Sequence, residues 1–310
     1  MIPNSLEEKE YKMKIEDTFQ GGTATPIRAQ MTDRQKDISK IIEALEAGGR
    51  LYQSRSMESV RVERKSGGDP VTDAEREVNQ VLFEALVSEG EGWFSEESAD
   101  SSDRLHRSRI WIVDPLDGTK EYVTRIPEWC ISIALLENGK LVAAGVLNPL
   151  TDELFYGTPE TGVVYQDRSG HGFNENSESS EMPLVLASRS ECKHGEWERF
   201  RGAPIRLRPM GSVAYKLALV AAGKADATWT LVPKHEWDVA AGVALLSSAR
   251  GIVVRKDGVG PTFNQKDPLL PGLVGLSQSG FRRLQSYLEK LSSAPGFEDC
   301  QPWANSILLG

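Results

Sequence analysis

Two segments near the N-terminal end of the chain repeat apolar residues at the spacing of an α-helix. The first follows Asp33, which can cap a helix, and its pattern predicts a helix that ends near Gly48-Gly49. The second starts at Thr72 or Asp73, after turn-forming residues at 65–70. The expected buried faces consist of Ile38, Ile41, Ile42 and Leu45 in the first helix, and Val78, Val81, Leu82 and Leu86 in the second.

The middle of the chain contains short apolar runs that are typical of β-strands. Runs at 131–136 and 141–147 flank Glu137-Asn138-Gly139-Lys140, and an Asn-Gly pair between two such runs predicts a β-hairpin. A buried strand is expected at 110–113, upstream of the hairpin. Residues 154–156 are expected to continue the same sheet.

The C-terminal part of the chain alternates predicted strands with predicted helices. This order is typical of α/β layering, in which helices pack against the faces of a sheet. The strands are expected at 184–187, 227–231 and 252–254, and the helices at 211–223 and 238–248.

Domain boundaries are suggested by stretches that lack an apolar period. Residues 1–30 have no such period, and we expect a disordered extension there. The polar stretch 166–181 is the best candidate boundary between two halves, 31–170 and 180–295. The last fifteen residues of the chain are weakly patterned and predict no element.

Composition narrows the classes of protein to consider. The 310 residues are 39% hydrophobic and carry a net charge of −9, which disfavours binding to a nucleic-acid polymer. No apolar run approaches the ~20 residues that span a bilayer, and the acidic N-terminus does not resemble a secretory signal. The three cysteines are widely spaced and predict neither a disulfide framework nor a zinc site. We therefore expect a cytoplasmic protein without a membrane partner.

The strongest chemical signal is the segment Asp114-Pro115-Leu116-Asp117-Gly118-Thr119, which follows an apolar strand. Two carboxylates that converge across a turn repel each other unless a cation lies between them, and oxygen ligands favour Mg²⁺ together with a phosphate. The backbone N–H groups of Gly118 and Thr119 offer a seat for an anion at the start of a helix. The alternative is an Asx-turn that merely links a strand to a helix.

Two further groups of acidic residues gain weight when they are considered together with this segment. Glu96 and Glu97 follow an aromatic pair, although adjacent glutamates commonly form a solvated surface turn. Asp238 stands at the head of a helix of small residues, where an aspartate commonly serves as an N-cap.

These segments occur in the order that is characteristic of the inositol-monophosphatase superfamily, which the chain resembles over roughly residues 33 to 290. The segments are DPVTD at 69–73, SEES at 95–98, DPLDGT at 114–119 and WDVAAG at 237–242. The resemblance implies an α/β fold of the αβαβα sandwich type. It also implies a possible homodimer.

Within the superfamily, the chain is most similar to 3′(2′),5′-bisphosphate nucleotidases of the CysQ type. The segments that carry this similarity are DGTKEY at 117–122, FSEE at 94–97 and ASRS at 187–190. The sequence departs from the pattern at 247–251, where SSARG replaces a helix end similar to EAGG. It departs again at Glu191, where a histidine is usual.

The resemblance implies a role for each matching residue. The implied ligands of two or three Mg²⁺ ions are Glu96, Asp114, the carbonyl oxygen of Leu116, Asp117 and Asp238. The implied catalytic residues are Asp73 and Thr119, which would orient the attacking water, with Glu96 close by. The implied substrate contacts are Gly118, Thr119, Ser212, Lys216 and Asp238, with Arg189 and Lys234 as weaker candidates.

The activity implied by the resemblance is hydrolysis of 3′-phosphoadenosine 5′-phosphate (PAP) to AMP and phosphate by a metal-activated water. Inhibition by Li⁺ would accompany it. One alternative is activity on inositol 1-phosphate or fructose 1,6-bisphosphate within the same superfamily. An alternative of another class is a non-catalytic, regulatory phosphate-binding protein that keeps the fold.

Overall fold

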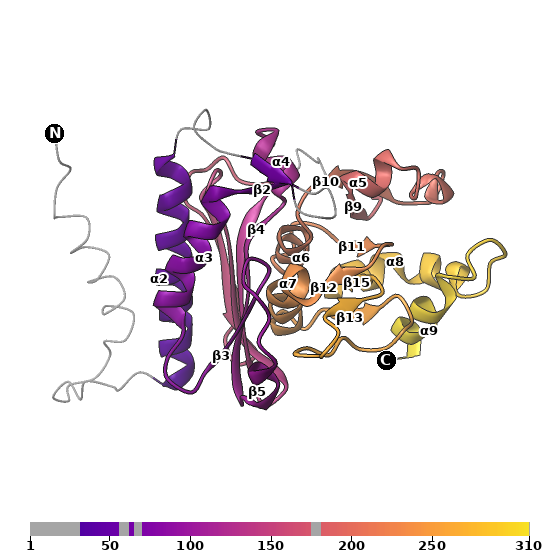
Figure 1. Cartoon of the computed structure of the whole chain (residues 1–310). Helices are drawn as coiled ribbons and strands as arrows, with labels where there is room; N and C mark the ends of the chain where they lie inside the picture. The colour runs from indigo at the N-terminus through magenta and orange to yellow at the C-terminus, as the bar shows by residue number, and fades with distance from the viewer. Residues whose placement is uncertain (1–31, 56–61, 65–69, 175–180, 310) are drawn as a thin grey trace, which may run out of the picture. The chain divides into compact units, whose positions relative to one another are not determined.

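Five layers of helices and sheets alternate in the computed structural model, which describes residues 32–55, 62–64, 70–174 and 181–309 (Figure 1). The described residues from Asp33 onwards pack as one compact unit. The expected extension at 1–30, part of the expected turn at 65–70 and part of the polar stretch 166–181 lie outside the described residues. The layered αβαβα arrangement confirms the fold class that the sequence predicts.

The first sheet has six strands that follow one another in space in chain order. β3 is parallel to β4, and the remaining neighbours are antiparallel. The predicted hairpin between β5 and β6 is present, with positive φ angles at Asn138 (50°) and Gly139 (77°), as a tight hairpin turn requires. The strands are β3 (Gly92–Ser95), β4 (Arg109–Asp117), β5 (Cys130–Glu137), β6 (Lys140–Asn148), β7 (Glu153–Thr158) and β8 (Gly162–Asp167).

Helices α2 (Asp33–Ser54) and α3 (Asp73–Leu86) pack on one face of this sheet through their apolar stripes. The prediction that α2 ends near Gly48-Gly49 is wrong, because the helix continues through both glycines to Ser54. A Cβ atom at Gly48 would lie 3.0 Å from a methyl group of Ile131, and one at Gly49 would lie 2.8 Å from Leu147. These glycines therefore permit close packing of the helix on the sheet. The hairpin of β1 (Val62–Arg64) and β2 (Pro70–Thr72) precedes α3.

The second sheet is mixed and has the strand order β10-β9-β11-β15-β13. Helices α6 (Val213–Ala221) and α7 (Glu236–Ser248) lie between the two sheets, and both helices are almost wholly buried (Figure 1). Strands are present at the three predicted places. The strands of this sheet are β9 (Leu184–Ser188), β10 (Arg206–Met210), β11 (Ala227–Thr230), β13 (Ile252–Arg255) and β15 (Leu273–Leu276).

Helices α8 (Gln278–Leu291) and α9 (Gln301–Leu309) cover the outer face of the second sheet. Within the weakly patterned C-terminal stretch, Trp303 and Ile307 of α9 are buried against the sheet. No helix within the described ranges has the length and apolar character needed to cross a bilayer. The short elements are η2 (Ser102–His106), α4 (Thr119–Val123), α5 (Arg189–Lys193), η3 (Glu198–Phe200), β12 (Lys234–His235) and β14 (Leu269–Leu270).

A fully buried carboxylate, that of Glu153 in β7, joins three parts of the fold. It accepts hydrogen bonds from the Phe173 backbone N–H (2.7 Å), the Tyr165 hydroxyl (2.9 Å) and the Tyr215 hydroxyl of α6. Because Phe173 and Tyr215 are buried, their donors would be left without the carboxylate as acceptor, and we expect Glu153→Leu to lower the free energy of unfolding by about 3–5 kcal/mol. Chemical denaturation would measure this loss. The exposed Glu160→Leu serves as the control, and an equal effect of the two variants would contradict the prediction.

Candidate active site

An irregularity in β4 places two aspartates on one face of the first sheet. Asp114 pairs with Ser132 of β5, whereas Asp117 pairs with Cys130, so three steps along β4 match two steps along β5. Side chains three residues apart in a regular strand point to opposite faces, but one extra residue restores the same face. The Asp-Pro-Leu-Asp segment therefore turns both carboxylates towards the helices between the sheets. Asp114 also accepts the Leu116 N–H at 2.9 Å, so the Asx-turn alternative coexists with this arrangement.

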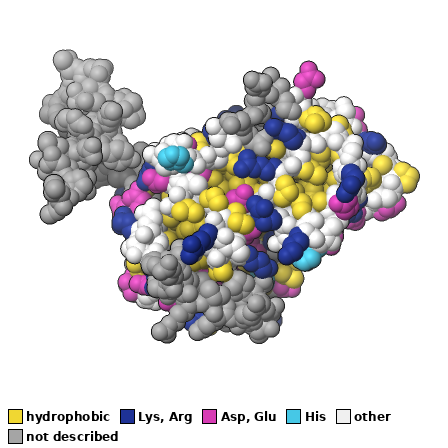
Figure 2. Space-filling view, turned by 90° about the horizontal axis from the view of Figure 1, so that it is seen from above, with side chains coloured by type: hydrophobic (Ala, Val, Ile, Leu, Met, Phe, Trp, Pro, Cys, Tyr) yellow, Lys and Arg dark blue, Asp and Glu magenta, His cyan; other side chains and the backbone are white. Residues whose placement is uncertain are grey.

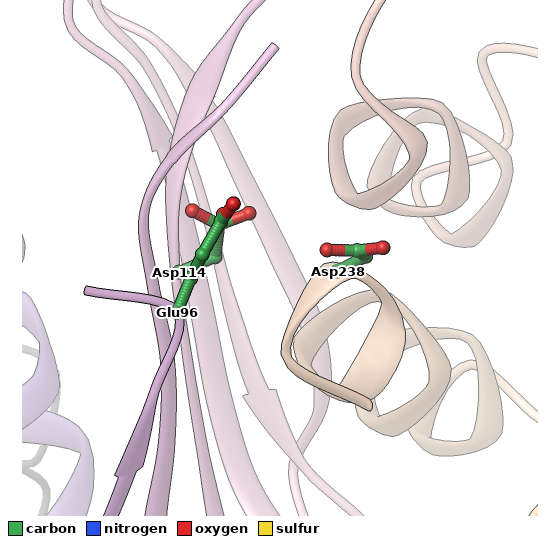
Figure 3. A group of neighbouring side chains, drawn as sticks. All are labelled: Glu96, Asp114 and Asp238. Carbon is green, nitrogen blue, oxygen red and sulfur yellow. The ribbon is translucent and has the colours of Figure 1, made fainter. Parts of the chain in front are cut away.

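Three carboxylates converge from different elements at this point. Each of Glu96, Asp114 and Asp238 has a ligand oxygen within 4.8 Å of those of the other two. Figure 3 shows the carboxylate of Asp238, at the beginning of α7, facing the carboxylates of Glu96 and Asp114 at the sheet. Glu96 directly follows β3, which is parallel to β4, so both strands deliver their acids at the same edge. The sequence-predicted ligands from three distant segments are thus brought together.

The electrostatics of this cluster are unfavourable without a cation. Burial, followed by the charges of Glu96 and Asp117, raises the pKa of Asp114 well above its usual value. Burial and the neighbouring acids also raise the pKa of Asp238 to about 8, although Asp238 accepts the His235 N–H at 2.9 Å. A divalent cation would offset this repulsion, and a donor set made only of oxygen suits Mg²⁺. The residues therefore fit the metal that the sequence predicts.

Asp117 connects the sheet to helix α6. Its Oδ2 atom accepts hydrogen bonds from the Ser212 hydroxyl and from the Ala214 backbone N–H, both at 2.6 Å. Burial raises the pKa of Asp117, while these two hydrogen bonds oppose the rise. Ser212 also caps α6 by accepting the Tyr215 N–H, and it adopts a φ of 45°, which is unusual for a residue other than glycine. Ser212, predicted as a substrate contact, is therefore engaged with Asp117.

The hydroxyl of Thr119 is bonded to an acid that the sequence analysis did not single out. Thr119 Oγ1 donates to Glu75 Oε1 at 2.8 Å and lies 3.3 Å from the carbonyl oxygen of Leu116. Asp73, the expected partner of Thr119, lies at the more exposed start of α3 and pairs with Arg55 at 3.1 Å, so its role in orienting the water stays a prediction. Glu75 is 1% exposed. Its position three residues before Val78 on the apolar stripe is the signal that would have identified it.

Gly118 allows the tight connection between β4 and the short helix α4. Its φ of 102° lies in the region that favours glycine, and a Cβ atom there would lie 3.0 Å from the Cβ atom of Trp129. The next residues of α4, Lys120 and Glu121, also reach the pocket described below. The predicted phosphate seat at Gly118 and Thr119 is therefore beside the carboxylate cluster.

A cavity of about 520 Å³ opens beside the carboxylates. Seen from above, several Lys and Arg side chains surround a centre where acidic and hydrophobic side chains meet (Figure 2). The residues of the cavity wall that bear on the chemistry are Glu96, Asp114, Leu116, Asp117, Gly118, Thr119, Lys120, Glu121, Arg189, Ser212, Lys216, Lys234, His235 and Asp238. With the exception of Asp73, the cavity wall thus contains every predicted site residue.

The three candidate cations for substrate binding differ in their partners. Lys216 is 2% exposed and donates to three backbone carbonyls, and burial lowers its pKa to about 8. Arg189 pairs with Glu128 and lies 3.5 Å from Glu121. Among the residues that the structure describes, Lys234 has no ion-pair partner within 4.0 Å. The positive charge of Lys234 instead acts on Asp117 and Asp238, where it opposes the rise in pKa that burial causes.

Comparison with known proteins identifies this arrangement of motifs. Residues 33–289 match the model of the inositol monophosphatase family. The chain belongs to this family. Inositol monophosphatase family members are metal-dependent phosphatases, and the chain is accordingly a phosphatase of phosphate monoesters.

Relatives within the inositol monophosphatase family differ in their named substrates. An inositol-1-monophosphatase from Mesorhizobium japonicum is 32% identical over 231 residues, which cover 69% of this chain and 83% of the relative. A fructose-1,6-bisphosphatase/inositol-1-monophosphatase from Thermotoga maritima is 31% identical over 202 residues, covering 64% of this chain and 76% of the relative. The crystal structure of CysQ from Bacteroides thetaiotaomicron superposes with a TM-score of 0.64. That alignment covers 78% of this chain and 97% of CysQ at 24% identity, and it shows a shared fold.

Proposed function

We propose that the chain is a Mg²⁺-dependent phosphatase that hydrolyses the 3′-phosphate of PAP, yielding AMP and phosphate. The observation that carries the proposal is a partly buried cluster of carboxylates that opens into a cavity whose wall also holds lysine and arginine. The carboxylates suit a metal and one phosphate, and the basic residues suit a second anionic group. PAP has two phosphates on one small molecule.

Glu96, Asp114, Asp117 and Asp238 would hold Mg²⁺, together with the carbonyl oxygen of Leu116. Bound there, Mg²⁺ supplies positive charge that stabilises the transferring phosphoryl group and makes water more acidic. The carboxylate of Asp114 is buried and those of Glu96 and Asp238 are partly buried, so their charges act more strongly than they would in open water. The backbone N–H groups of Gly118 and Thr119, which line the same cavity, would bind a phosphate held at the cluster.

The pair of Thr119 and Glu75 is suited to receive the proton of the attacking water. Because the hydroxyl hydrogen of Thr119 is committed to Glu75, Thr119 Oγ1 can accept a hydrogen bond from a water in the cavity. As the water oxygen bonds to phosphorus, its proton passes to Thr119 Oγ1 and the Thr119 proton passes to Glu75. The bond between phosphorus and the ribose oxygen breaks, and solvent protonates that oxygen.

Lys234 is the best placed candidate for the second phosphate of the substrate. It lines the cavity from β12, next to the start of α7, and its ammonium group is not neutralised by an acid within 4.0 Å in the described part of the chain. Arg189 stands on the cavity wall too, although Glu121 and Glu128 already bind its guanidinium group. A phosphate that reaches Arg189 must compete with these two acids.

Inositol 1-phosphate is the second candidate substrate, favoured by the names of the relatives. The Mesorhizobium relative is named for this activity, and the Thermotoga relative is named for fructose 1,6-bisphosphate as well. Either substrate would use the same carboxylates. The two hypotheses differ in whether a second anionic group contributes to recognition.

Phosphate release from PAP, inositol 1-phosphate and fructose 1,6-bisphosphate, each with and without Mg²⁺, tests the proposal. We expect hydrolysis that depends on Mg²⁺, is inhibited by Li⁺ and has its largest kcat/KM with PAP. A larger kcat/KM with either sugar phosphate would reject the nucleotide as substrate but retain the metal chemistry. Absence of any gain on adding Mg²⁺ would favour the regulatory phosphate-binding alternative.

A further inference from the structure

Lys216 lines the cavity, but its ammonium group is bonded to the protein backbone. It extends from the first turns of α6 back over the turn that precedes this helix, and its Nζ atom donates to the carbonyl oxygens of Ser212 (2.7 Å), Gly211 (3.1 Å) and Met210 (3.4 Å). An ammonium group has three hydrogens, and three carbonyls are within reach of it. Its hydrogen-bonding capacity is therefore directed at the backbone of this turn.

The turn that Lys216 binds has an unfavourable backbone conformation. Ser212 has a φ of 45° without being glycine, a conformation that persists only where surrounding contacts enforce it. The shortest of the three Lys216 hydrogen bonds goes to the carbonyl of this same residue. The N–H of the preceding residue, Gly211, is held by Glu128 at 2.9 Å, so the turn is fixed from both sides.

The turn at 210–212 also fixes the orientation of the Asp117 carboxylate. Both donors that bind Asp117 Oδ2 come from it or from the helix start that follows, namely the Ser212 hydroxyl and the Ala214 N–H, each at 2.6 Å. Groups that orient a metal ligand in this way commonly change metal affinity about 10-fold to 100-fold when they are removed. A contact that holds this turn therefore also determines how Asp117 is oriented in the proposed metal site.

The geometry points to Lys216 as a positioning residue that holds the turn at 210–212 so that Asp117 is oriented for Mg²⁺. The inference rests on the proposed function in one respect, that Asp117 binds Mg²⁺. It assigns to Lys216 a role different from direct contact with the substrate. Lys216 acts through the Ser212 carbonyl, and Ser212 and Ala214 act on Asp117.

The sign of the change in Mg²⁺ affinity distinguishes this role from a purely electrostatic one. Lys216 carries a positive charge near the carboxylates, and charges of the same sign repel, so removal of that charge alone would strengthen Mg²⁺ binding. Loss of the positioning contacts would weaken it. Isothermal titration calorimetry with Mg²⁺ on the full chain, without substrate, measures the affinity independently of turnover.

We expect Lys216→Met to bind Mg²⁺ at least about 10-fold more weakly than the wild type. Lys234→Met is the matched control, because it also removes a lysine charge near Asp117, but the Lys234 side chain makes no hydrogen bond to the described backbone. The Mg²⁺ affinity of this variant should equal or exceed that of the wild type. In kinetics at saturating Mg²⁺, Lys216→Met should raise KM for PAP and for inositol 1-phosphate by similar factors. Equal or tighter Mg²⁺ binding by Lys216→Met, or a KM increase confined to PAP, would overturn the inference.

Ser212→Gly keeps the inference testable if Lys216→Met does not fold. Glycine adopts a φ of 45° readily, so the turn survives, but the hydroxyl donor to Asp117 is lost. Mg²⁺ affinity should fall in this variant also, and an unchanged affinity would contradict the inference. A wild-type protein that binds no Mg²⁺ would instead refute the proposed function together with the inference, whereas normal wild-type binding with an unaffected Lys216→Met refutes the inference alone.

Discussion

Asp114→Asn should lower kcat by about 10³-fold, equivalent to about 4 kcal/mol of transition-state stabilisation. Asp114 is 2% exposed and is the buried member of the group that it forms with Glu96 and Asp238. Asparagine keeps the shape and an oxygen for the Leu116 N–H, but it removes the negative charge that a metal needs. Steady-state kinetics at saturating Mg²⁺ would measure the loss.

The same substitution should stabilise the protein when Mg²⁺ is withheld. Burial and neighbouring acids raise the pKa of Asp114 in the folded state, which means that its charge at pH 7 opposes folding. Asparagine cannot ionise, so the Tm of metal-free Asp114→Asn should exceed that of the metal-free wild type. Adding Mg²⁺ should raise the Tm of the wild type much more than that of the variant.

Asp103→Asn provides the control for Asp114→Asn, since it makes the same chemical change at an exposed residue of η2. It should leave both kcat and the response to Mg²⁺ near their wild-type values. If Asp114→Asn retained kcat within a factor of a few of the wild type, Asp114 would not be a metal ligand. A lower Tm for the metal-free variant would show that repulsion within the cluster is not the dominant effect.

Glu75→Gln should reduce kcat by about 10²–10⁴-fold, the range typical of general acid–base residues. Glutamine keeps a hydrogen-bond partner for Thr119, but it cannot take up the proton that Thr119 passes on. KM and Mg²⁺ affinity should change far less than kcat, because Glu75 acts on the reaction through the hydroxyl of Thr119. Single-turnover measurements would establish that the chemical step is the one slowed.

Asp73→Asn is the matched comparison for Glu75→Gln, two residues away on the same helix. Asp73 makes a partly exposed ion pair with Arg55, and such pairs contribute about 0–1 kcal/mol. The Asp73 variant should therefore keep nearly all of its activity. Loss of activity in Asp73→Asn, with a normal Glu75→Gln, would restore the assignment that the sequence motif suggests.

The residue pattern predicted the convergence of Asp114 and Asp117, whereas the grouping of Glu96 and Asp238 with them was implied by the family resemblance. Asp114 follows a buried strand and Asp238 begins a buried helix, so the pattern itself indicates where each acid lies. The bulge that aligns Asp117 with Asp114 depends on pairing with β5, which the local pattern does not specify. The convergence of Asp114 and Asp117 was thus predictable from the residues, but the bulge that causes it was not.

The sequence motif indicated Asp73, whereas the hydroxyl of Thr119 is bonded to Glu75, because two acids share the first turn of α3. A helix places Asp73 and Glu75 on different faces, and the buried face is the one that reaches Thr119. At Gly48-Gly49 the sequence suggested a helix end, but tertiary packing against Ile131 and Leu147 determines what these glycines do. Both differences from the sequence pattern arise where a contact distant in sequence decides between two locally reasonable structures.

The proposed ligands come from the end of β3, from β4 and from the start of α7, so the chain can assemble them only when α7 has docked onto the first sheet. A partly folded chain that has formed its sheet but not this docking has no complete set of ligands. Mg²⁺ would therefore bind the native state alone and, at a free concentration 100 times its dissociation constant, add about 2.7 kcal/mol to the free energy of unfolding. We expect resistance to proteolysis to rise and fall with the magnesium supply, so that an idle enzyme would be degraded fastest where its cofactor is scarce.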